Sequence, residues 1–316
     1  MAAHTPILLI VFNRPAETQQ VFNAIRNIQP AQLYIAADGP RPDRPDDIEN
    51  CAKVREIVSN VSWPCTVKTL YREKNLGCML GVSGAIDWFF ENEEEGIILE
   101  DDCVPNPSFY SFCIQLLEKY RQDKRIYAIC GRNPMGTTSI NESYLFSRFF
   151  KEWGWASWRR AWQQRNLGKE NFDRAVKEAV LERTLNDVPM ARYTLQTNES
   201  VHYSGHNTWD YQWLFNILSQ NGLVIVPRVN LVENVGLNSG VHFGDNPNII
   251  RSLYKVDTEA IEKDLVHPAF VFADTRFDQQ CFYAIHPYLL PKKQPLLQKV
   301  RDSILYRTRK LIGKYK

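Results

Sequence analysis

Three consecutive acidic residues, Glu100, Asp101 and Asp102, come directly after the apolar run 96–99. Carboxylates this close together repel one another, and their natural use in a protein is to hold a hard divalent cation. A solvated acidic turn or the start of a helix would use the same residue types. Because the acids end an apolar run that has the character of a buried strand, we predict a site for Mn²⁺ or Mg²⁺ there.

Three further residues could take part in chemistry at the same site. Asp38 begins an Asp-Gly-Pro turn and could accept hydrogen bonds from a ribose or a base, although these residues also favour a plain turn. Asp210 lies among aromatic residues that could raise its pKa for a role as a general base, but an acid also suits the first turn of a helix. His242, in the glycine-rich segment 234–245, could ligate a metal or contact a diphosphate, or be an ordinary surface residue.

Four tryptophans within residues 151–162 could offer a platform on which the apolar faces of sugar rings stack. Three of them recur at the spacing of a helix face, which is equally typical of residues that pack in a core. Both interpretations stay open for Trp153, Trp155, Trp158 and Trp162.

The elements that must position these residues alternate between strand and helix patterns in the first 130 residues. Such alternation is typical of βαβ units and predicts an α/β fold with a mostly parallel sheet flanked by helices. Ligands of such sheets bind beyond the carboxyl ends of the strands, where the acids and Asp38 lie. Strands are expected at 7–12, 32–38, 66–71, 96–100 and 126–130, and helices from Pro15, around 51–58, from 77 to about 90 and at 109–120.

The second half of the chain is less regular. Residues 170–195 and 208–218 have helical patterns, and 222–227 reads as a short strand. No linker composition separates the two halves, so we expect them to share one extended sheet. The boundaries that follow are 1–135, 136–290 and a C-terminal tail, 291–316.

Charge is unevenly spread along the chain. The tail holds nine Lys/Arg and one acid, a charge of +8, so the net charge of +2 leaves −6 for residues 1–290. An acidic body argues against a nucleic-acid-binding protein with a broad basic face. Apolar residues alternate with the basic ones of the tail, which fits either an amphipathic helix on an anionic membrane or a helix docked on the body.

Cysteine usage and hydropathy bear on the compartment. The seven cysteines are odd in number and form no CxxC pair, which favours a reducing compartment over a disulfide framework. The sequence has no run of 18 apolar residues that would span a bilayer. We therefore expect a cytoplasmic protein whose tail could contact the inner membrane from that side.

In their order and spacing, these motifs resemble the GT-A fold glycosyltransferases, and most closely the bacterial family-2-like nucleotide-diphospho-sugar transferases of surface polysaccharide synthesis. The resemblance runs from residue 12 to 242, about three-quarters of the chain, although each matching piece is short. The pieces are Phe12-Asn13-Arg14-Pro15, Asp38-Gly39-Pro40, Arg72 with Asn75-Leu76-Gly77, Glu100-Asp101-Asp102, residues 154–158, Trp209-Asp210, and Asn234-Val235-Gly236 followed by His242.

The resemblance implies a metal-dependent, inverting transfer of a sugar from a nucleotide diphosphate, most commonly UDP, to a glycan or lipid-linked acceptor. Residues 1–135 would bind the nucleotide sugar, and 136–290 would supply the acceptor site and the base, Asp210. Asp102 would ligate Mn²⁺ or Mg²⁺ together with Glu100 and His242, and residues 154–158 would lie in a loop that closes over the donor. Substrate contacts are implied for Asn13, Arg14, Asp38, Gly39, Arg72, Asn75, Gly77, Asp101, Gly154, Trp155 and Trp209. Pro40 departs from the small hydroxyl residue usual in its place, which leaves base recognition open.

Two other readings remain. A nucleotidyltransferase that makes sugar nucleotides would share the sheet and the metal but needs a glycine-rich phosphate loop after the first strand, and residues 12–15 are not one. An oxidoreductase of the dinucleotide-binding type is not one of the two, because no GxGxxG follows the first strand. A non-catalytic sugar- or nucleotide-binding protein with a decayed site is the remaining alternative.

Overall fold

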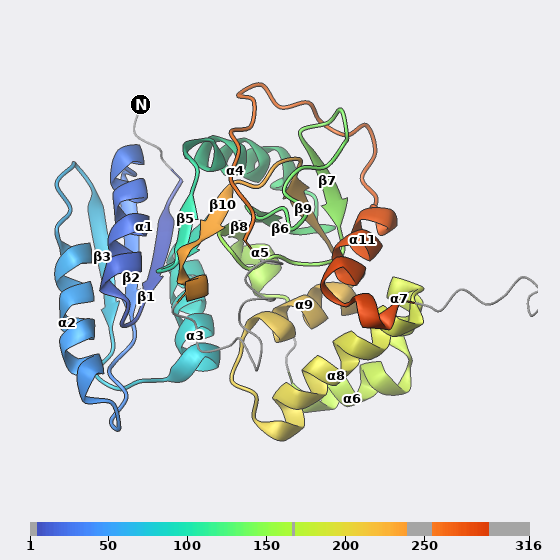
Figure 1. The fold of residues 1–316 in the computed structure, drawn as a ribbon, viewed down its shortest axis with the longest axis horizontal. Helices are drawn as coiled ribbons and strands as arrows, with labels where there is room; N and C mark the ends of the chain where they lie inside the picture. Colours follow the sequence, from blue (N-terminus) through green and yellow to red (C-terminus); the bar gives the residue numbers. More distant parts are fainter. Residues whose placement is uncertain (1–4, 166–167, 239–254, 291–316) are drawn as a thin grey trace, which may run out of the picture.

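The computed structural model describes residues 5–165, 168–238 and 255–290, and its central feature is an eight-stranded sheet with helices on both faces (Figure 1). The strand order is β3-β2-β1-β4-β8-β6-β9-β7. Six of the strands run in one direction, and β7 and β8 run against them. The strands are β1 (Ile7–Val11), β2 (Gln32–Ala37), β3 (Thr66–Tyr71), β4 (Glu95–Glu100), β6 (Ile126–Cys130), β7 (Tyr144–Ser147), β8 (Trp155–Trp158) and β9 (Leu223–Pro227). The predicted α/β fold with a mostly parallel sheet is confirmed, and strands of both halves lie in one sheet.

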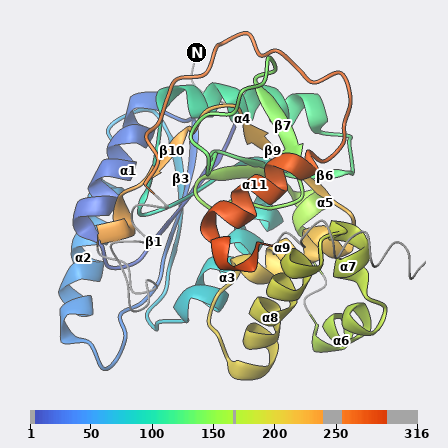
Figure 2. The same cartoon turned by 45° about the vertical axis from the view of Figure 1, so that its right-hand side comes forward.

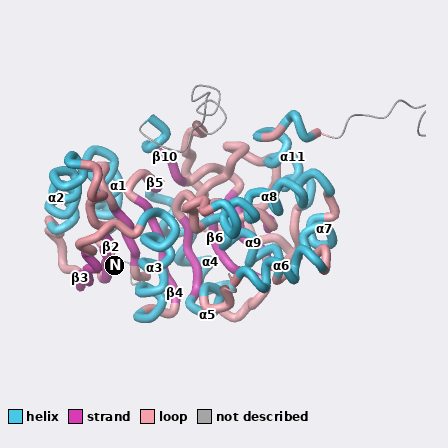
Figure 3. Tube along the Cα trace, turned by 90° about the horizontal axis from the view of Figure 1, so that it is seen from below, coloured by secondary structure: helices cyan, strands magenta, loops and turns pink. Residues whose placement is uncertain are grey.

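Alternate residues of the central strands bury their side chains on opposite faces, which sorts the helices into two layers (Figure 3). One face packs against α1 (Pro15–Ile28), α2 (Pro45–Ser59) and α4 (Pro107–Tyr120). The other packs against α3 (Gly77–Asn92), α5 (Arg159–Trp162), α9 (Asp210–Ser219) and α11 (Thr275–Ile285). Strands buried on both faces explain the continuous apolar runs in the sequence.

A third cluster of buried side chains joins the helices of the second half beside α9 and α11 (Figure 2). The sequence showed one helical pattern over 170–195, but the structure has three helices there. Ala179 and Asn186, each with φ of 51°, take the left-handed conformation and interrupt the pattern. The three are α6 (Lys169–Lys177), α7 (Val180–Leu185) and α8 (Val188–Ser204).

The prediction of a helix face for three tryptophans is wrong. Trp155 and Trp158 belong to β8, an antiparallel strand between β4 and β6, and only Trp162 lies in the short α5. Residues 155–158 are therefore part of the sheet, with Gly154 directly before the strand, and not a loop that closes over a donor. Pairing with two neighbouring strands satisfies the backbone of β8, which outweighs the helical spacing of its side chains.

Short elements beyond the predicted ones complete the fold. A small antiparallel pair joins β5 (Cys103–Pro105) to β10 (Val232–Asn234) and is followed by a 3₁₀ turn, η1 (Val235–Asn238). A second 3₁₀ turn, η2 (Pro287–Leu289), follows α11. In the part of the chain that the structure describes, no helix is both long enough and apolar enough to cross a bilayer.

Candidate active site

The predicted acidic motif lies where the strand order reverses, between β1 and β4. The loop after β1 meets the loop after β4 at this point, which is the usual place for a ligand in such a sheet. The backbone N–H of Phe12 donates to Asp101 Oδ2 at 3.0 Å, and Arg14 contacts Asp101 Oδ1 at 3.2 Å and Asp102 Oδ2 at 2.5 Å. Asp101 is 3% exposed, and both its oxygens are engaged, so it ties the two loops together.

The β5–β10 pair brings the Asn234-Val235-Gly236 motif against these acids. Asn234 lies opposite Cys103, and the Val235 N–H donates to the backbone oxygen of Asp102 at 2.8 Å. A Cβ on Gly236 would lie 2.4 Å from Asp102 Oδ2 and 2.6 Å from Arg14 Nη1, so only glycine allows this approach. Two motifs more than 130 residues apart therefore meet, as their shared place in the resemblance implied. His242 lies outside the described residues.

Negative charge is concentrated in this cluster. Burial raises the pKa of Glu100, and the charges of Asp102 and Asp101 raise it further against the opposing effect of Arg14. Burial also raises the pKa of Asp101, with Arg14 opposing. Three carboxylates thus share one guanidinium, and the excess of negative charge suits a cation.

A Mn²⁺ or Mg²⁺ ion needs several oxygen ligands around it. No group of three His, Cys, Asp or Glu side chains is arranged to hold a metal ion among residues 5–165, 168–238 and 255–290. One or two carboxylates completed by substrate phosphates is, however, the usual arrangement for Mg²⁺. Asp102 and Glu100 fit such a shared site, in which the diphosphate supplies the remaining oxygens.

Asp210 is the first residue of α9, the helix that packs on the same face of the sheet as α3. Burial raises the pKa of Asp210 to about 6, the charge of Glu152 adds to the rise, and the hydrogen bond from the Thr208 hydroxyl opposes it. The Asp210 charge in turn raises the pKa of Glu100. The predicted base and the predicted metal motif are therefore electrostatic neighbours.

Cys78, in the first turn of α3, lies close to both Glu100 and Asp210. Burial raises the pKa of its thiol to about 12, with contributions from Glu100 and Asp210 and an opposing hydrogen bond from the Trp209 backbone. The first turn of α3, the end of β4 and the start of α9 are thus adjacent. A thiol with this pKa stays protonated at neutral pH.

The predicted nucleotide-binding residues form a second cluster, at the N-terminus of α3. The Asp38 carboxylate accepts the backbone N–H of Leu76 at 3.0 Å and of Gly77 at 3.2 Å. Nearby, Arg72 donates to the Gly81 carbonyl at 2.9 Å, and Asn75 donates to the Gly39 carbonyl at 2.9 Å. A Cβ on Gly39 would lie 2.6 Å from the backbone of residues 73 and 74, so this turn requires glycine. These residues lie together, and their contact with a nucleotide stays a prediction.

Asn13 points into a buried network that sequence reasoning missed. Its amide donates to Asp47 Oδ1 at 2.6 Å, and Arg41 forms two side-chain hydrogen bonds to the same carboxylate at 2.6 and 3.0 Å. The hydrogen bonds from Arg41 hold the pKa of Asp47 at about 2, against the effect of burial. Asp47 resembled an ordinary acid of a first helical turn, so no local signal marked it.

The tryptophans belong to the core. Trp155 stacks on Trp209 with ring centroids 5.7 Å apart, and Trp162 and Trp213 pack around this pair. Trp155 is 1% exposed and Trp209 4%, which gives both a packing role. Gly154, with φ of 61°, packs against Leu99 and Val232 beneath the acidic cluster. The core interpretation is confirmed for Trp155, Trp158 and Trp162, whereas Trp153 is only partly buried, and direct contact of Trp155 or Trp209 with a substrate stays a prediction.

Sequence reasoning also missed Glu152, Cys78, Asn207 and Thr208, which surround Asp210 or the first turn of α3. The polar run 206–208 before a helix was the one available signal.

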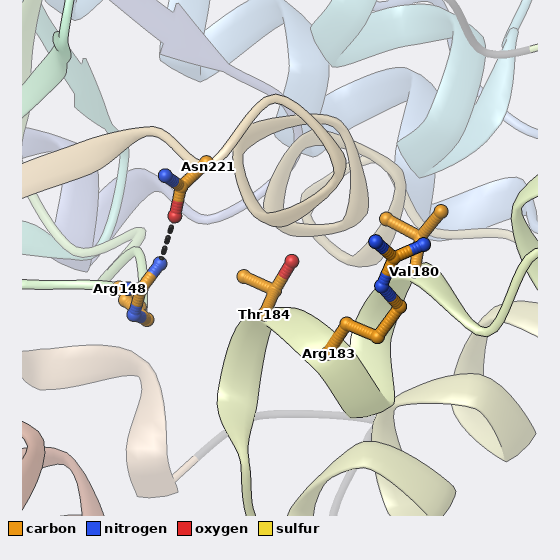
Figure 4. A pocket seen from close by; sticks show the side chains of 5 residues that line it. All are labelled: Arg148, Val180, Arg183, Thr184 and Asn221. Atoms are coloured by element: carbon orange, nitrogen blue, oxygen red, sulfur yellow. Dashed lines mark hydrogen bonds between the residues drawn. The ribbon is translucent and has the colours of Figure 1, made fainter.

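A separate hollow of about 450 Å³ lies at α7 and the turn after α9 (Figure 4). Its lining contains none of the predicted site residues and consists of Arg148, Val180, Arg183, Thr184 and Asn221.

Comparisons with known proteins give distant structural likenesses. No protein-family model matches the chain, and no curated protein matches its sequence. Mouse xyloside xylosyltransferase 1 in its apo form aligns with a TM-score of 0.39 and 9% identity, over 82% of this chain and 96% of that one. UDP-glucose pyrophosphorylase complexed with UDP-glucose aligns with a TM-score of 0.37 and 8% identity, over 74% of this chain and 94% of that one. HddC from Yersinia pseudotuberculosis aligns with a TM-score of 0.29 and 6% identity, over 49% of this chain and 77% of that one. Likenesses of this degree assign no activity to the chain.

Proposed function

We propose that this chain is a glycosyltransferase that moves a sugar from a nucleotide diphosphate, of which UDP is the first candidate, to an acceptor hydroxyl with inversion. The observation that carries the proposal is that Glu100, at the carboxyl end of β4, interacts electrostatically with both Asp102 and Asp210. The acids belong to segments about 110 residues apart, and burial and nearby negative charge raise the pKa of Glu100 and of Asp210, as is typical of functional sites.

In this proposal the acidic cluster binds the donor. Asp102 and Glu100 would hold Mn²⁺ or Mg²⁺, and His242, if it reaches the site, would join them. The cation supplies Lewis-acid stabilisation of the negative charge that develops on the leaving diphosphate. Arg14 lies in contact with Asp102 and would offer the diphosphate a second positive group.

Asp210 would carry out the proton transfer. The acceptor oxygen attacks the anomeric carbon from the face opposite the diphosphate, a new carbon–oxygen bond forms, and the bond to the diphosphate oxygen breaks. Asp210 takes the proton of the acceptor hydroxyl in the same step. Its pKa of about 6 leaves it ionised at neutral pH and basic enough to accept that proton.

The biological setting of the proposal rests on the motif resemblance. It comprises a glycan or lipid-linked acceptor, bacterial surface polysaccharide synthesis and a cytoplasmic location. The sugar and the linkage are open within it. A nucleotidyltransferase and a non-catalytic binding protein are the competing assignments, and the experiment must separate them.

The test is a thermal-shift screen of nucleoside diphosphates and nucleotide sugars with and without Mn²⁺. A ligand at about 100 times its dissociation constant stabilises the fold by roughly 2.7 kcal/mol, which is a readily measured shift. We expect a Mn²⁺-dependent shift that Asp102→Ala abolishes and that Asp264→Ala, at an exposed acid outside the cluster, retains. The absence of any such shift in the wild type would contradict the proposal.

Product analysis then separates the enzyme classes. A glycosyltransferase releases nucleoside diphosphate from its donor in the presence of Mn²⁺, either by transfer or by slow hydrolysis. A nucleotidyltransferase, supplied with pyrophosphate, forms nucleoside triphosphate instead. Binding without either product would favour the non-catalytic protein.

A further inference from the structure

The segment that leads into α9 docks on the first turn of α3. Asn207 Oδ1 accepts the backbone N–H of Met79 at 2.7 Å, across 128 residues of sequence. Gly77, at the start of α3, has φ of 74°, and a Cβ there would lie 2.4 Å from Asn207 Nδ2. The turn therefore leaves room for the Asn207 amide and for little else. Figures 1 and 2 show the start of α9 beside α3.

This contact satisfies part of the N-terminus of α3. The first N–H groups of a helix have no partner within the helix, and the N-cap residue Leu76 provides no side-chain cap. Asp38 accepts the N–H groups of Leu76 and Gly77, and Asn207 accepts that of Met79. Side chains from the two halves of the chain thus complete the same helix end.

Asn207 lies three residues before Asp210, and little freedom remains between them. The Thr208 hydroxyl donates to the Asp210 carboxylate, and the Trp209 ring is buried in the aromatic cluster. Trp209 anchors this short connection to the core of the second half, and Asn207 anchors it to α3. The place of the Asp210 carboxylate relative to Glu100 depends on both anchors.

We propose that Asn207 is a positioning residue that holds Asp210 against the donor-binding half of the site. The inference rests on the base role that the proposed function gives to Asp210. Asn207 packs against Gly77 of the predicted nucleotide cluster and bonds the backbone of Met79, but its hydrogen bonds do not go to the acids. Its loss should misplace the base and leave donor binding intact.

The experiment compares Asn207→Ala, Asn207→Asp and a control, Asn92→Ala. Asn92 lies in the last turn of α3, is exposed like Asn207 and also forms a side-chain hydrogen bond to the backbone, with Trp88. Because a displacement of about 1 Å can cost up to 10²-fold in rate and Asn207 is solvent-accessible, we expect Asn207→Ala to lower kcat about tenfold. Its donor dissociation constant in calorimetry should stay within about twofold of the wild type.

Asn207→Asp keeps an acceptor oxygen for the Met79 N–H, and a carboxylate is favourable at a helix N-terminus. We therefore expect Asn207→Asp to recover most of the kcat that Asn207→Ala loses, and Asn92→Ala to match the wild type. Equal kcat for Asn207→Ala and wild type, or an equal loss in both Asn207 variants, would overturn the inference. A loss of donor affinity in step with kcat would do the same, because it would indicate a general structural role.

A second readout does not depend on turnover. Amide hydrogen exchange at Met79 and through residues 205–212 should be faster in Asn207→Ala than in the wild type or in Asn92→Ala. Unchanged exchange at both places would refute the docking itself. If the wild type transfers no sugar from any donor while the exchange difference is present, the proposed function fails and the docking stands.

Discussion

The four carboxylates at the site differ in what surrounds them. Both carboxylate oxygens of Asp101 are bonded, one by the Phe12 N–H and one by the Arg14 guanidinium, so Asp101 joins the loop after β4 to the loop after β1. Asp102 shares Arg14 with Asp101 and lies beside Gly236, and Glu100 is crowded by its neighbours. Asp210 has a hydroxyl partner and a raised pKa, which is the environment of a base. The same residue type therefore serves different purposes within one site.

Asp210→Asn tests the base directly. Asparagine is isosteric but cannot accept the acceptor proton, so we expect donor binding to persist while transfer falls by about 10²–10⁴-fold. In the wild type the base must be ionised, so the rate should rise with pH through about 6 and fall about tenfold per pH unit below it. The pH–rate profile and donor calorimetry check both expectations. Near-normal turnover in Asp210→Asn would assign the base elsewhere.

At the scale of elements, the loop after β1 is held in place by the buried carboxylate of Asp47, which pairs with the partly exposed Arg41. Asp47, 2% exposed in the first turn of α2, receives hydrogen bonds from Arg41 and Asn13. Asn13 is adjacent to Arg14, so this network also supports the residue that pairs with Asp102. The structure thus connects the start of α2 to the acidic cluster through two short side-chain contacts.

Asp47→Ala should destabilise the fold strongly. Removing Asp47 takes the acceptor from the Asn13 amide and from the partly exposed Arg41 guanidinium, and hydrogen bonds to a charged group contribute about 1.5–3 kcal/mol. The change in unfolding midpoint and in unfolding free energy measures this effect. The control Asp46→Ala, at an exposed acid in the same turn, should cost less than about 1 kcal/mol. Equal effects from the two variants would contradict the assigned network.

The pH dependence of stability follows from the same residue. The pKa of Asp47 falls from 3.8 to about 2 on folding, so the ionised carboxylate favours the folded state. This stabilisation, about 2 kcal/mol, is complete above pH 4 and is lost as the pH falls toward 2. Denaturation measured between pH 2 and 5 should show this loss in the wild type and a shallower one in Asp47→Ala.

At the scale of the whole molecule, one sheet joins the half that carries the acids to the half that carries the base. The aromatic cluster of Trp155, Trp162, Trp209 and Trp213 fills the face of the sheet beneath the start of α9. Asp210, the proposed base, therefore begins a helix that packs on a buried aromatic core. The basic C-terminal segment lies outside the described residues, and its role stays a prediction.

Deletion of residues 291–316 tests that role. The charge of +8 should bind vesicles that contain anionic lipid, and the binding should weaken as salt is added. We expect the truncated protein to lose sedimentation with such vesicles and to keep donor hydrolysis. Vesicles of phosphatidylcholine alone provide the control. Equal sedimentation of the full-length and truncated proteins would end the membrane hypothesis.

Much of the first half could be predicted from the sequence because its signals are local. Apolar runs marked β1, β2, β4 and β6, helical spacing marked α1 to α4, and the acids at the end of β4 marked the candidate site. The short strands β5 and β10 carry three residues each, too few for a periodic pattern. Yet this pair brings Gly236 to Asp102.

The sequence by itself determined the class of the fold, and it predicted an edge of the sheet and a set of residues that could carry chemistry. Periodicity and polarity along the chain are enough for those conclusions. Only the tertiary structure decided that Trp155 and Trp158 form a strand, that Asp38 caps α3 and that Asn207 joins α3 to the base. A strand needs neighbours to pair with, and a polar group's role depends on which partner reaches it. Those partners lie between 38 and 128 residues away for Asp38 and Asn207, where no local pattern can indicate them.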